Sequence, residues 1–205
     1  MEKQFNFYFI LLLIAILSDL ITPFLLAFKY PGYSHLNDVI SLLGADNSPV
    51  KRWEGLNLIF VGALFIVFAL GQKAFFSNMG CLHYCYFIGI LAFGLGCVFA
   101  GIFPADARGI GETFSGKVHG ITSGIGFMLL LLCPLWAVFI GEFKSNSIPN
   151  IILFILSLST FVLFVISENI DTGVLRYTGL YQRLNLLVMY LCLLMNFMYM
   201  LRPAE

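Results

Sequence analysis

Charged side chains are scarce in this sequence. Asp, Glu, Lys and Arg make up 11% of its 205 residues, against about 25% in soluble domains. The polar remainder is too small to form a separate soluble domain. Eleven basic and eleven acidic residues cancel to a net charge of zero, which excludes a strongly basic surface and argues against a nucleic-acid partner.

We also expect neither a cysteine pair nor a cleavable leader. The five cysteines are odd in number, form no CxxC pair and lie in or beside apolar runs, so we interpret them as small packing residues. No A-x-A-like site interrupts the first apolar run, which indicates a retained span and not a signal peptide. No convincing internal repeat is present, which counts against an ordinary secondary transporter.

Long apolar runs are abundant, and 60% of the residues are hydrophobic. A helix needs about 20 mostly apolar residues to cross a bilayer. Six segments meet this requirement, which predicts an all-α, multi-pass cell-membrane protein whose residues 1–205 form a single bundle of transmembrane helices. The predicted spans cover about 6–28, 53–72, 80–102, 118–141, 150–168 and 184–201.

The connections between these spans differ in length. The longer ones, at 29–52, 103–117 and 169–183, follow the odd-numbered spans and therefore share one side of the membrane, which we call the loop face. This face carries more basic residues than the other but also more connecting chain, so the positive-inside rule discriminates weakly. Six-span proteins often keep both termini in the cytoplasm, and we expect an extracytoplasmic loop face.

The first connection contains the pattern of a short helix at 34–44. Four apolar residues recur at i, i+3, i+4 and i+7, beginning at Leu36, which predicts one apolar stripe. Ser34 is a suitable N-cap and Gly44 a suitable C-terminal stop, while Asp38 and Ser41 fall on the polar side. The predicted helix lies flat at the interface or folds over the bundle as a lid.

One carboxylate, Asp19, lies inside the first apolar run, and we place the other ten acids outside these runs. An acid at the centre of a spanning helix costs roughly 2.5–3.5 kcal/mol on insertion scales, so such a residue normally faces a protein interior or a cavity. Pro23 removes the helical partner of the residue 19 carbonyl. Asp19 is therefore a candidate cation, proton or substrate site, and the alternative is a carboxyl hydrogen-bonded to a neighbouring helix.

The fourth span contains small and polar residues at helical spacing. Gly116, Gly120 and Gly124 follow the small-xxx-small pattern, which predicts close approach of another helix. His119 and Ser123 lie one turn apart on nearly the same face. A histidine at this depth can serve as a base or a metal ligand, and the alternative is a hydrogen bond between helices.

Other polar candidates gather in the loop-face connections. They are His35, Asp38, Ser41, Asp106, Glu168, Gln182 and Arg183. Histidines and carboxylates at one level can bind a divalent metal or form an acid–base set, so we consider His35, Asp106 and His119 as metal ligands and Arg183 as a contact for a phosphate headgroup. No HxxxH or HExxH spacing occurs, and the alternative is a set of solvated loop residues.

Several of these residues belong to longer motifs. YPGYSHLNDVISLLGA at 30–45 is followed by Ser48-Pro49, and Phe103-Pro104-Ala105-Asp106 precedes His119-Gly120. Together they resemble a prokaryotic family of six-span membrane proteins known as domain of unknown function nine-nine-eight. The resemblance covers nearly the whole chain and implies six helices and a motif-bearing first connection. It implies no activity and no catalytic residue.

Two classes of function remain open. The first is a membrane-embedded enzyme, such as a hydrolase, acting on a lipid or lipid-linked substrate. His119, Asp106, His35 and Ser41 would be its catalytic residues, and Asp19, Asp38, Ser123, Glu168, Gln182 and Arg183 would bind substrate. The second is a non-catalytic binder or carrier of a lipid, ion or solute, or an accessory subunit. We expect membrane lipids as partners, and a second copy or another membrane protein is also compatible. A divalent metal is a candidate cofactor.

Overall fold

The computed structural model describes residues 2–73, 75–76, 79–107, 109, 111–170 and 172–199, with side chains from residue 6 onward. In this part of the chain the regular elements are helices, and there is no strand. Arg108 of the third connection and residues 200–201 of the last predicted span lie outside the described residues.

Six helical segments are long and apolar enough to cross a membrane, as predicted. The fourth is built from two helices, and Pro134 lies at the start of the second, where its missing N–H costs no helical hydrogen bond. The α-helices are α1 (Glu2–Ala27), α2 (Lys51–Gln72), α3 (Cys81–Ile102), α4 (Phe114–Leu131), α5 (Cys133–Phe139), α6 (Ser147–Ser167) and α7 (Thr178–Tyr199). Three short 3-10 helices are η1 (Ile40–Gly44), η2 (Gly141–Asn146) and η3 (Gly173–Arg176).

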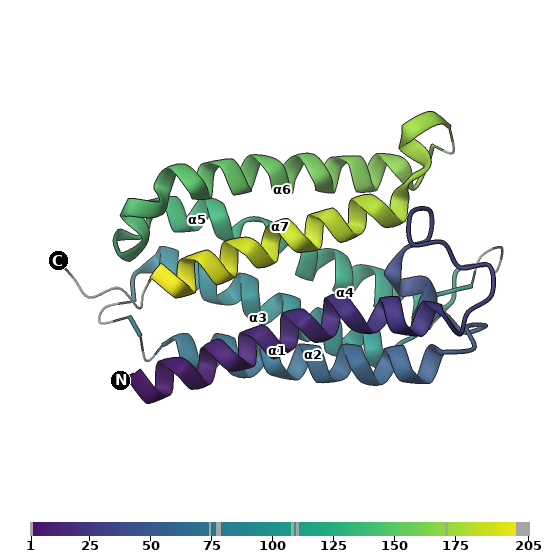
Figure 1. Cartoon of the computed structure of the whole chain (residues 1–205), viewed down its shortest axis with the longest axis horizontal. Helices are drawn as coiled ribbons and strands as arrows, with labels where there is room; N and C mark the ends of the chain where they lie inside the picture. The colour runs from purple at the N-terminus through teal and green to yellow at the C-terminus, as the bar shows by residue number, and fades with distance from the viewer. Residues whose placement is uncertain are drawn as a thin grey trace.

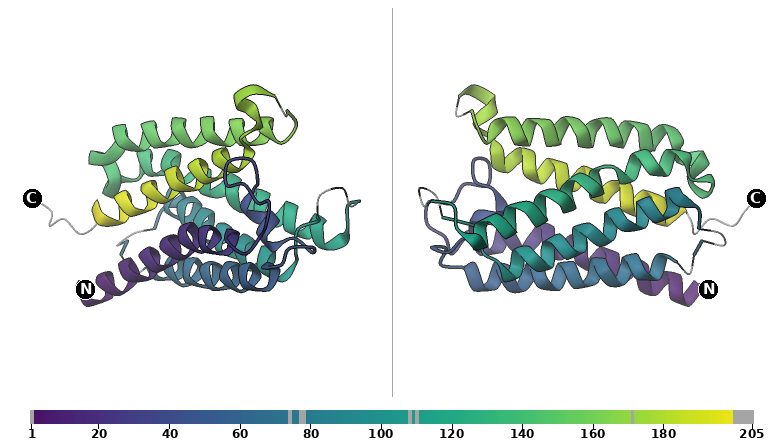
Figure 2. Two further views of the ribbon diagram at one scale, coloured as in Figure 1. Left: turned by 45° about the vertical axis from the view of Figure 1, so that its right-hand side comes forward. Right: turned by 180° about the vertical axis from the view of Figure 1, so that it is seen from behind.

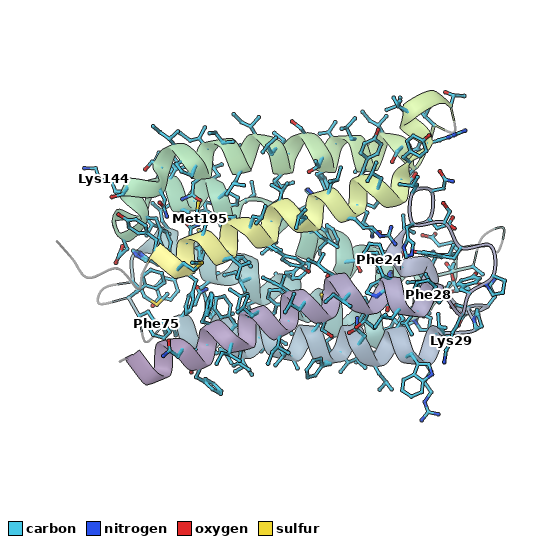
Figure 3. The ribbon with its side chains drawn as sticks, viewed as in Figure 1. Phe24, Phe28, Lys29, Phe75, Lys144 and Met195 are labelled. Atoms are coloured by element: carbon cyan, nitrogen blue, oxygen red, sulfur yellow. The ribbon has the colours of Figure 1, made fainter. Side chains whose placement is uncertain are left out.

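The helices run roughly side by side, with the long connections at one end of the bundle (Figure 1). Figure 2 shows α6 and α7 together on one side and α1 and α2 together on the other. Lys29, at the start of the first connection, marks the loop face, and Lys144 lies at the opposite end (Figure 3). The chain therefore places its three long connections over the same end of the helices.

Close packing between α2 and α3 depends on glycine. A Cβ added to Gly62 would overlap the Gly94 carbonyl oxygen and the Val98 side chain, and one added to Gly94 would come within 2.9 Å of the Gly62 carbonyl oxygen. The two backbones therefore approach as closely as small residues permit. Phe65 and Phe93 from these helices then meet Tyr190 of α7 in the buried core.

The first connection contains a short helix, but a smaller one than the pattern at 34–44 predicts. Only Ile40–Gly44 is helical, and it is a 3-10 helix with Ile40, Leu43 and Gly44 buried. The backbone N–H of Ile40 donates to the side chain of Gln182 at 2.6 Å, and the carbonyls of His35 and Asp38 accept from Arg183. Tertiary hydrogen bonds from α7 thus satisfy groups that a longer helix would pair within itself.

Candidate functional site

A cavity of about 330 Å³ opens between the helices on the loop-face side of the bundle. Its apolar wall comes largely from phenylalanines of α3, α4 and α6. Its polar lining is formed by Asp19, Ser41, His119, Ser123, Glu168 and Gln182. These residues come from α1, η1, α4, α7 and the end of α6, so helix packing brings together candidates that are far apart in sequence.

Asp19 lies in this cavity and is held by α7. Its side chain is 4% exposed, and the Tyr190 hydroxyl donates to Asp19 Oδ2 at 2.5 Å. The neighbouring Ser18 donates to Asn57 Oδ1 of α2 at 2.7 Å. Asp19 therefore has both the hydrogen bond to a neighbouring helix and the cavity exposure that the sequence left as alternatives.

His119 lines the cavity in the second turn of α4 and is 7% exposed. Its Nδ1 lies 3.0 Å from the carbonyl oxygen of Phe103, at the end of α3. A carbonyl can only accept, so Nδ1 carries the hydrogen in this contact and Nε2 is the basic nitrogen of the neutral ring. Ser123 lines the same cavity one turn further along.

Asp106 does not line the cavity but organises the start of α4. It accepts hydrogen bonds from the Thr113 backbone N–H at 3.0 Å and from the Thr113 hydroxyl at 2.6 Å, and Thr113 in turn caps the helix by accepting from the N–H of Gly116. The bonds from Thr113, with a smaller contribution from His119, hold the pKa of Asp106 below its ordinary value. Asp106 therefore acts on the position of His119 through the helix that carries it.

Arg183 also lies outside the cavity lining, and its guanidinium ties the first connection to α7. Nη1 donates to the carbonyls of His35, Asp38 and Gly179 at 2.8–3.0 Å, and Nη2 donates to the Tyr33 hydroxyl at 2.7 Å. Nη2 also lies 3.3 Å from His35 Nδ1. Both terminal nitrogens are thus engaged, and Nε is buried without a hydrogen-bond partner among the described residues, so the guanidinium does not present its terminal nitrogens to a phosphate headgroup, the role considered from sequence.

The groups around Arg183 belong to the structure of the first connection. Partial burial and the Arg183 charge lower the pKa of His35, whose ring stacks on Phe24 with centroids 4.4 Å apart. Burial raises the pKa of Tyr33 to about 12. Asp38 is buried, and its Oδ2 accepts from the Ser34 N–H at 2.7 Å. Neither His35 nor Asp38 lines the cavity.

The three residues considered as metal ligands are not assembled. Among the described residues no group of three His, Cys, Asp or Glu side chains could hold a metal ion. His35 packs on Phe24, Asp106 accepts from Thr113, and His119 faces the Phe103 carbonyl. The physical reason is that each residue serves a different connection or helix end, although all three lie on the loop face.

Glu54 stands at the edge of the predicted span 53–72, where the sequence predicts no buried acid, and the structure buries it completely. It lies in the first turn of α2 with 0% exposure. Within the described residues neither carboxylate oxygen has a hydrogen-bond partner, and its charge interacts with those of Asp19 and Arg183. A glutamate in the first turn of a helix usually faces water, where the helix dipole stabilises its charge. The polar Asn57, one turn later in α2, was the feature of the sequence that could have indicated a buried polar face here.

The glycines of α4 have a different role from the predicted one. A Cβ at Gly120 or Gly124 would meet nothing within 4 Å, whereas one at Gly116 would overlap the Asp106 carboxylate. Gly120 and Gly124 line the cavity. The small-xxx-small pattern here creates space for the cavity and does not bring a second helix into contact, since α4 packs mainly on α3 and touches α6 little.

A second, more polar pocket of about 590 Å³ adjoins the first at Glu168. Asn37, Asn169 and Arg176 also line it, so it lies at the loop face. Partial burial raises the pKa of Glu168. Glu168 thus stands between the outer polar pocket and the deeper, partly apolar cavity.

Comparisons with known proteins give one family. A family model described as Protein of unknown function (DUF998) matches residues 13–198. No curated protein and no solved structure matches the chain.

Proposed function

We propose that this chain, which belongs to the DUF998 family of proteins of unknown function, is a membrane-embedded enzyme that acts on a lipid or lipid-linked substrate. The observation that carries the proposal is a cavity with two characters. Its lining carries a histidine, two carboxyl groups and two serines, together with the apolar rings of Phe127, Phe161 and Phe164. Small-molecule sites of roughly 300–1,000 Å³ combine apolar walls with a few polar groups in this way.

The substrate would enter from the bilayer between α4 and α6. These two helices touch little, and Gly120 and Gly124 leave the α4 side open. An acyl chain would lie against the phenylalanines of α4 and α6, while the polar group would reach Ser41, Asp19 and His119. This arrangement lets a molecule stay partly in lipid during binding.

The chemistry would be general base catalysis by His119. Its Nδ1 is engaged by the Phe103 carbonyl, so Nε2 would take a proton from a water that attacks an ester bond of the substrate and would then give that proton to the departing alkoxide. Asp19, held by Tyr190, would orient the polar group together with Ser123. Asp106 would be a positioning residue, because it organises the start of the helix that carries His119.

Turnover of membrane lipids by the purified protein tests this proposal. Wild type incubated with a total membrane lipid extract should produce new species by mass spectrometry, and His119→Gln should not. His83→Gln is the matched control, because His83 pairs with Glu142 at the opposite end of the bundle. Equal products from wild type and His119→Gln would contradict the enzymatic role of His119.

A non-catalytic binder or carrier is the second candidate. One observation favours it: no hydrogen bond joins Ser123 to His119 in the described part of the chain, so no nucleophile–base pair is formed in advance. A carrier or accessory subunit would retain its ligand without products. It would tolerate His119→Gln but lose binding with Asp19→Asn, whereas the enzyme would lose turnover with either variant.

We further propose that the loop face is extracytoplasmic in the cell membrane. A cysteine replacing Asn169 at that face, in a Cys81→Ser background that removes an exposed native thiol, should react with a membrane-impermeant maleimide in intact cells. A cysteine replacing Lys144 at the opposite end should react only after permeabilisation. The reverse pattern would place the loop face in the cytoplasm.

A further inference from the structure

We infer that the cavity selects amphiphiles whose polar group is a cation, an amine or quaternary ammonium, over those with an anionic group. The inference rests on the proposed function, in that it presupposes binding of an amphiphile in this cavity. It names the chemical class of the polar group.

The charge of the lining carries the first step. Two carboxyl groups line the cavity, those of Asp19 and Glu168, together with the imidazole of His119. No lysine or arginine lines it in the described part of the chain. Glu168 lies at the outer end of the cavity and Asp19 lies deep within it. A polar group that enters from the loop face would therefore pass Glu168 and approach Asp19. Opposite charges attract more strongly in such surroundings than in water.

The nearby arginines, Arg183 and Arg176, do not line the cavity. Arg183 donates to three backbone carbonyls and to the Tyr33 hydroxyl. Arg176 lies in the outer pocket, where it donates to Tyr177 and stacks on its ring. An anionic headgroup in the cavity would therefore face carboxyl groups, with no lysine or arginine among the lining residues that the structure describes.

Glu54 is a further carboxyl group near Asp19, although it does not line the cavity. It is completely buried, its carboxyl has no hydrogen-bond partner among the described residues, and it interacts electrostatically with Asp19. An opposite charge close to a carboxyl group favours its ionised form. A cation bound beside Asp19 would therefore be attracted to Asp19 and, more weakly, to Glu54.

The aromatic wall suits the same class of ligand. Phe93, Phe127, Phe161 and Phe164 line the cavity, and the faces of such rings attract ammonium groups, most strongly where water is excluded. Neutral and anionic groups gain no comparable attraction from a ring face. Carboxyl groups and ring faces therefore favour the same charge.

Three amphiphiles with one chain test the inference: hexadecylamine, hexadecanol and hexadecanoic acid. In a binding assay near pH 7, each unlabelled amphiphile is tested for its ability to displace radiolabelled hexadecylamine from the protein in nanodiscs. Specific binding is the radiolabel bound to wild type minus the radiolabel bound to Gly124→Leu, because the leucine side chain would fill the cavity. Gly141→Leu is the matched control, because Gly141 has equally open surroundings but lies outside the cavity.

We expect the amine to compete at concentrations at least about tenfold lower than the acid, and the alcohol to fall between them. Glu168→Gln, at the exposed end of the cavity, should reduce this ratio, and Asp19→Asn should reduce it further. Equal competition by the acid or the alcohol would overturn the charge preference and leave amphiphile binding intact. Equal signals from wild type and Gly124→Leu would overturn the proposed function itself.

Discussion

At the scale of single residues, two buried acids of this bundle have opposite surroundings. Asp19 accepts a hydrogen bond from Tyr190, whereas Glu54 has no hydrogen-bond partner among the described residues. Burial of a polar group costs free energy unless a hydrogen bond compensates it. The same kind of apolar substitution should therefore have opposite effects at the two positions.

We expect Glu54→Met to raise the free energy of unfolding by about 1–3 kcal/mol, because it removes an unpartnered buried carboxyl at similar volume. Asp19→Leu should lower it by a similar amount, since the Tyr190 hydroxyl would lose its acceptor. Thermal unfolding in detergent measures both. A loss of stability with Glu54→Met would show that its carboxyl has a stabilising partner.

Asp106 gives a pH-dependent prediction. Its folded pKa is below the ordinary 3.8 because of the Thr113 hydrogen bonds, so its contribution to stability is present above pH 3.8 and is lost as pH falls through the folded value. Asp106→Asn should therefore lower the melting temperature near pH 7. The difference from wild type should shrink below pH 3.8, and a difference that stays constant across this range would exclude an ionised Asp106 as its source.

At the scale of helices, glycines within apolar helices have different roles. Gly62 lets α2 and α3 approach, whereas Gly124 on α4 borders open space. Both occur in apolar helices that carry other small residues, Gly55 seven residues before Gly62 and Gly120 four residues before Gly124. What distinguishes them is the neighbour that packing supplies, or does not supply, on that face.

Alanine at these two positions should separate the roles. Gly62→Ala would place its Cβ against the Gly94 carbonyl and Val98, and we expect a loss of about 1–3 kcal/mol in the free energy of unfolding. Gly124→Ala has room and should be neutral or stabilising by about 0.5–1 kcal/mol, since alanine favours the helix. Thermal unfolding of both variants in one detergent makes the comparison; equal losses would mean that α4 also packs through Gly124.

At the scale of the whole molecule, the cavity exists only because several helices and η1 meet at one end of the bundle. A ligand that binds this folded arrangement and not the unfolded chain must stabilise the protein, by about 2.7 kcal/mol at a hundred times its dissociation constant. Thermal stability therefore reports occupancy without knowledge of any reaction.

We expect hexadecylamine to raise the melting temperature of wild type in a saturable way. Gly124→Leu, whose side chain occupies the cavity, should show little shift, while Gly141→Leu should behave as wild type does. Scanning fluorimetry in nanodiscs measures the shifts. Identical shifts in all three proteins would indicate that the amine acts through the surrounding lipid.

The sequence by itself determined the six spans, because the bilayer imposes a length and a composition that each segment must meet alone. It also marked Asp19 and His119, since polar groups within apolar runs are costly enough to stand out. Only the tertiary structure decided that Ser41, Glu168 and Gln182 share their cavity while His35, Asp106 and Arg183 hold connections and helix ends. It also buried Glu54 and opened space beside Gly124. The physical reason is that a residue's partners on other helices depend on how the helices pack, which no local pattern of apolar and polar residues specifies.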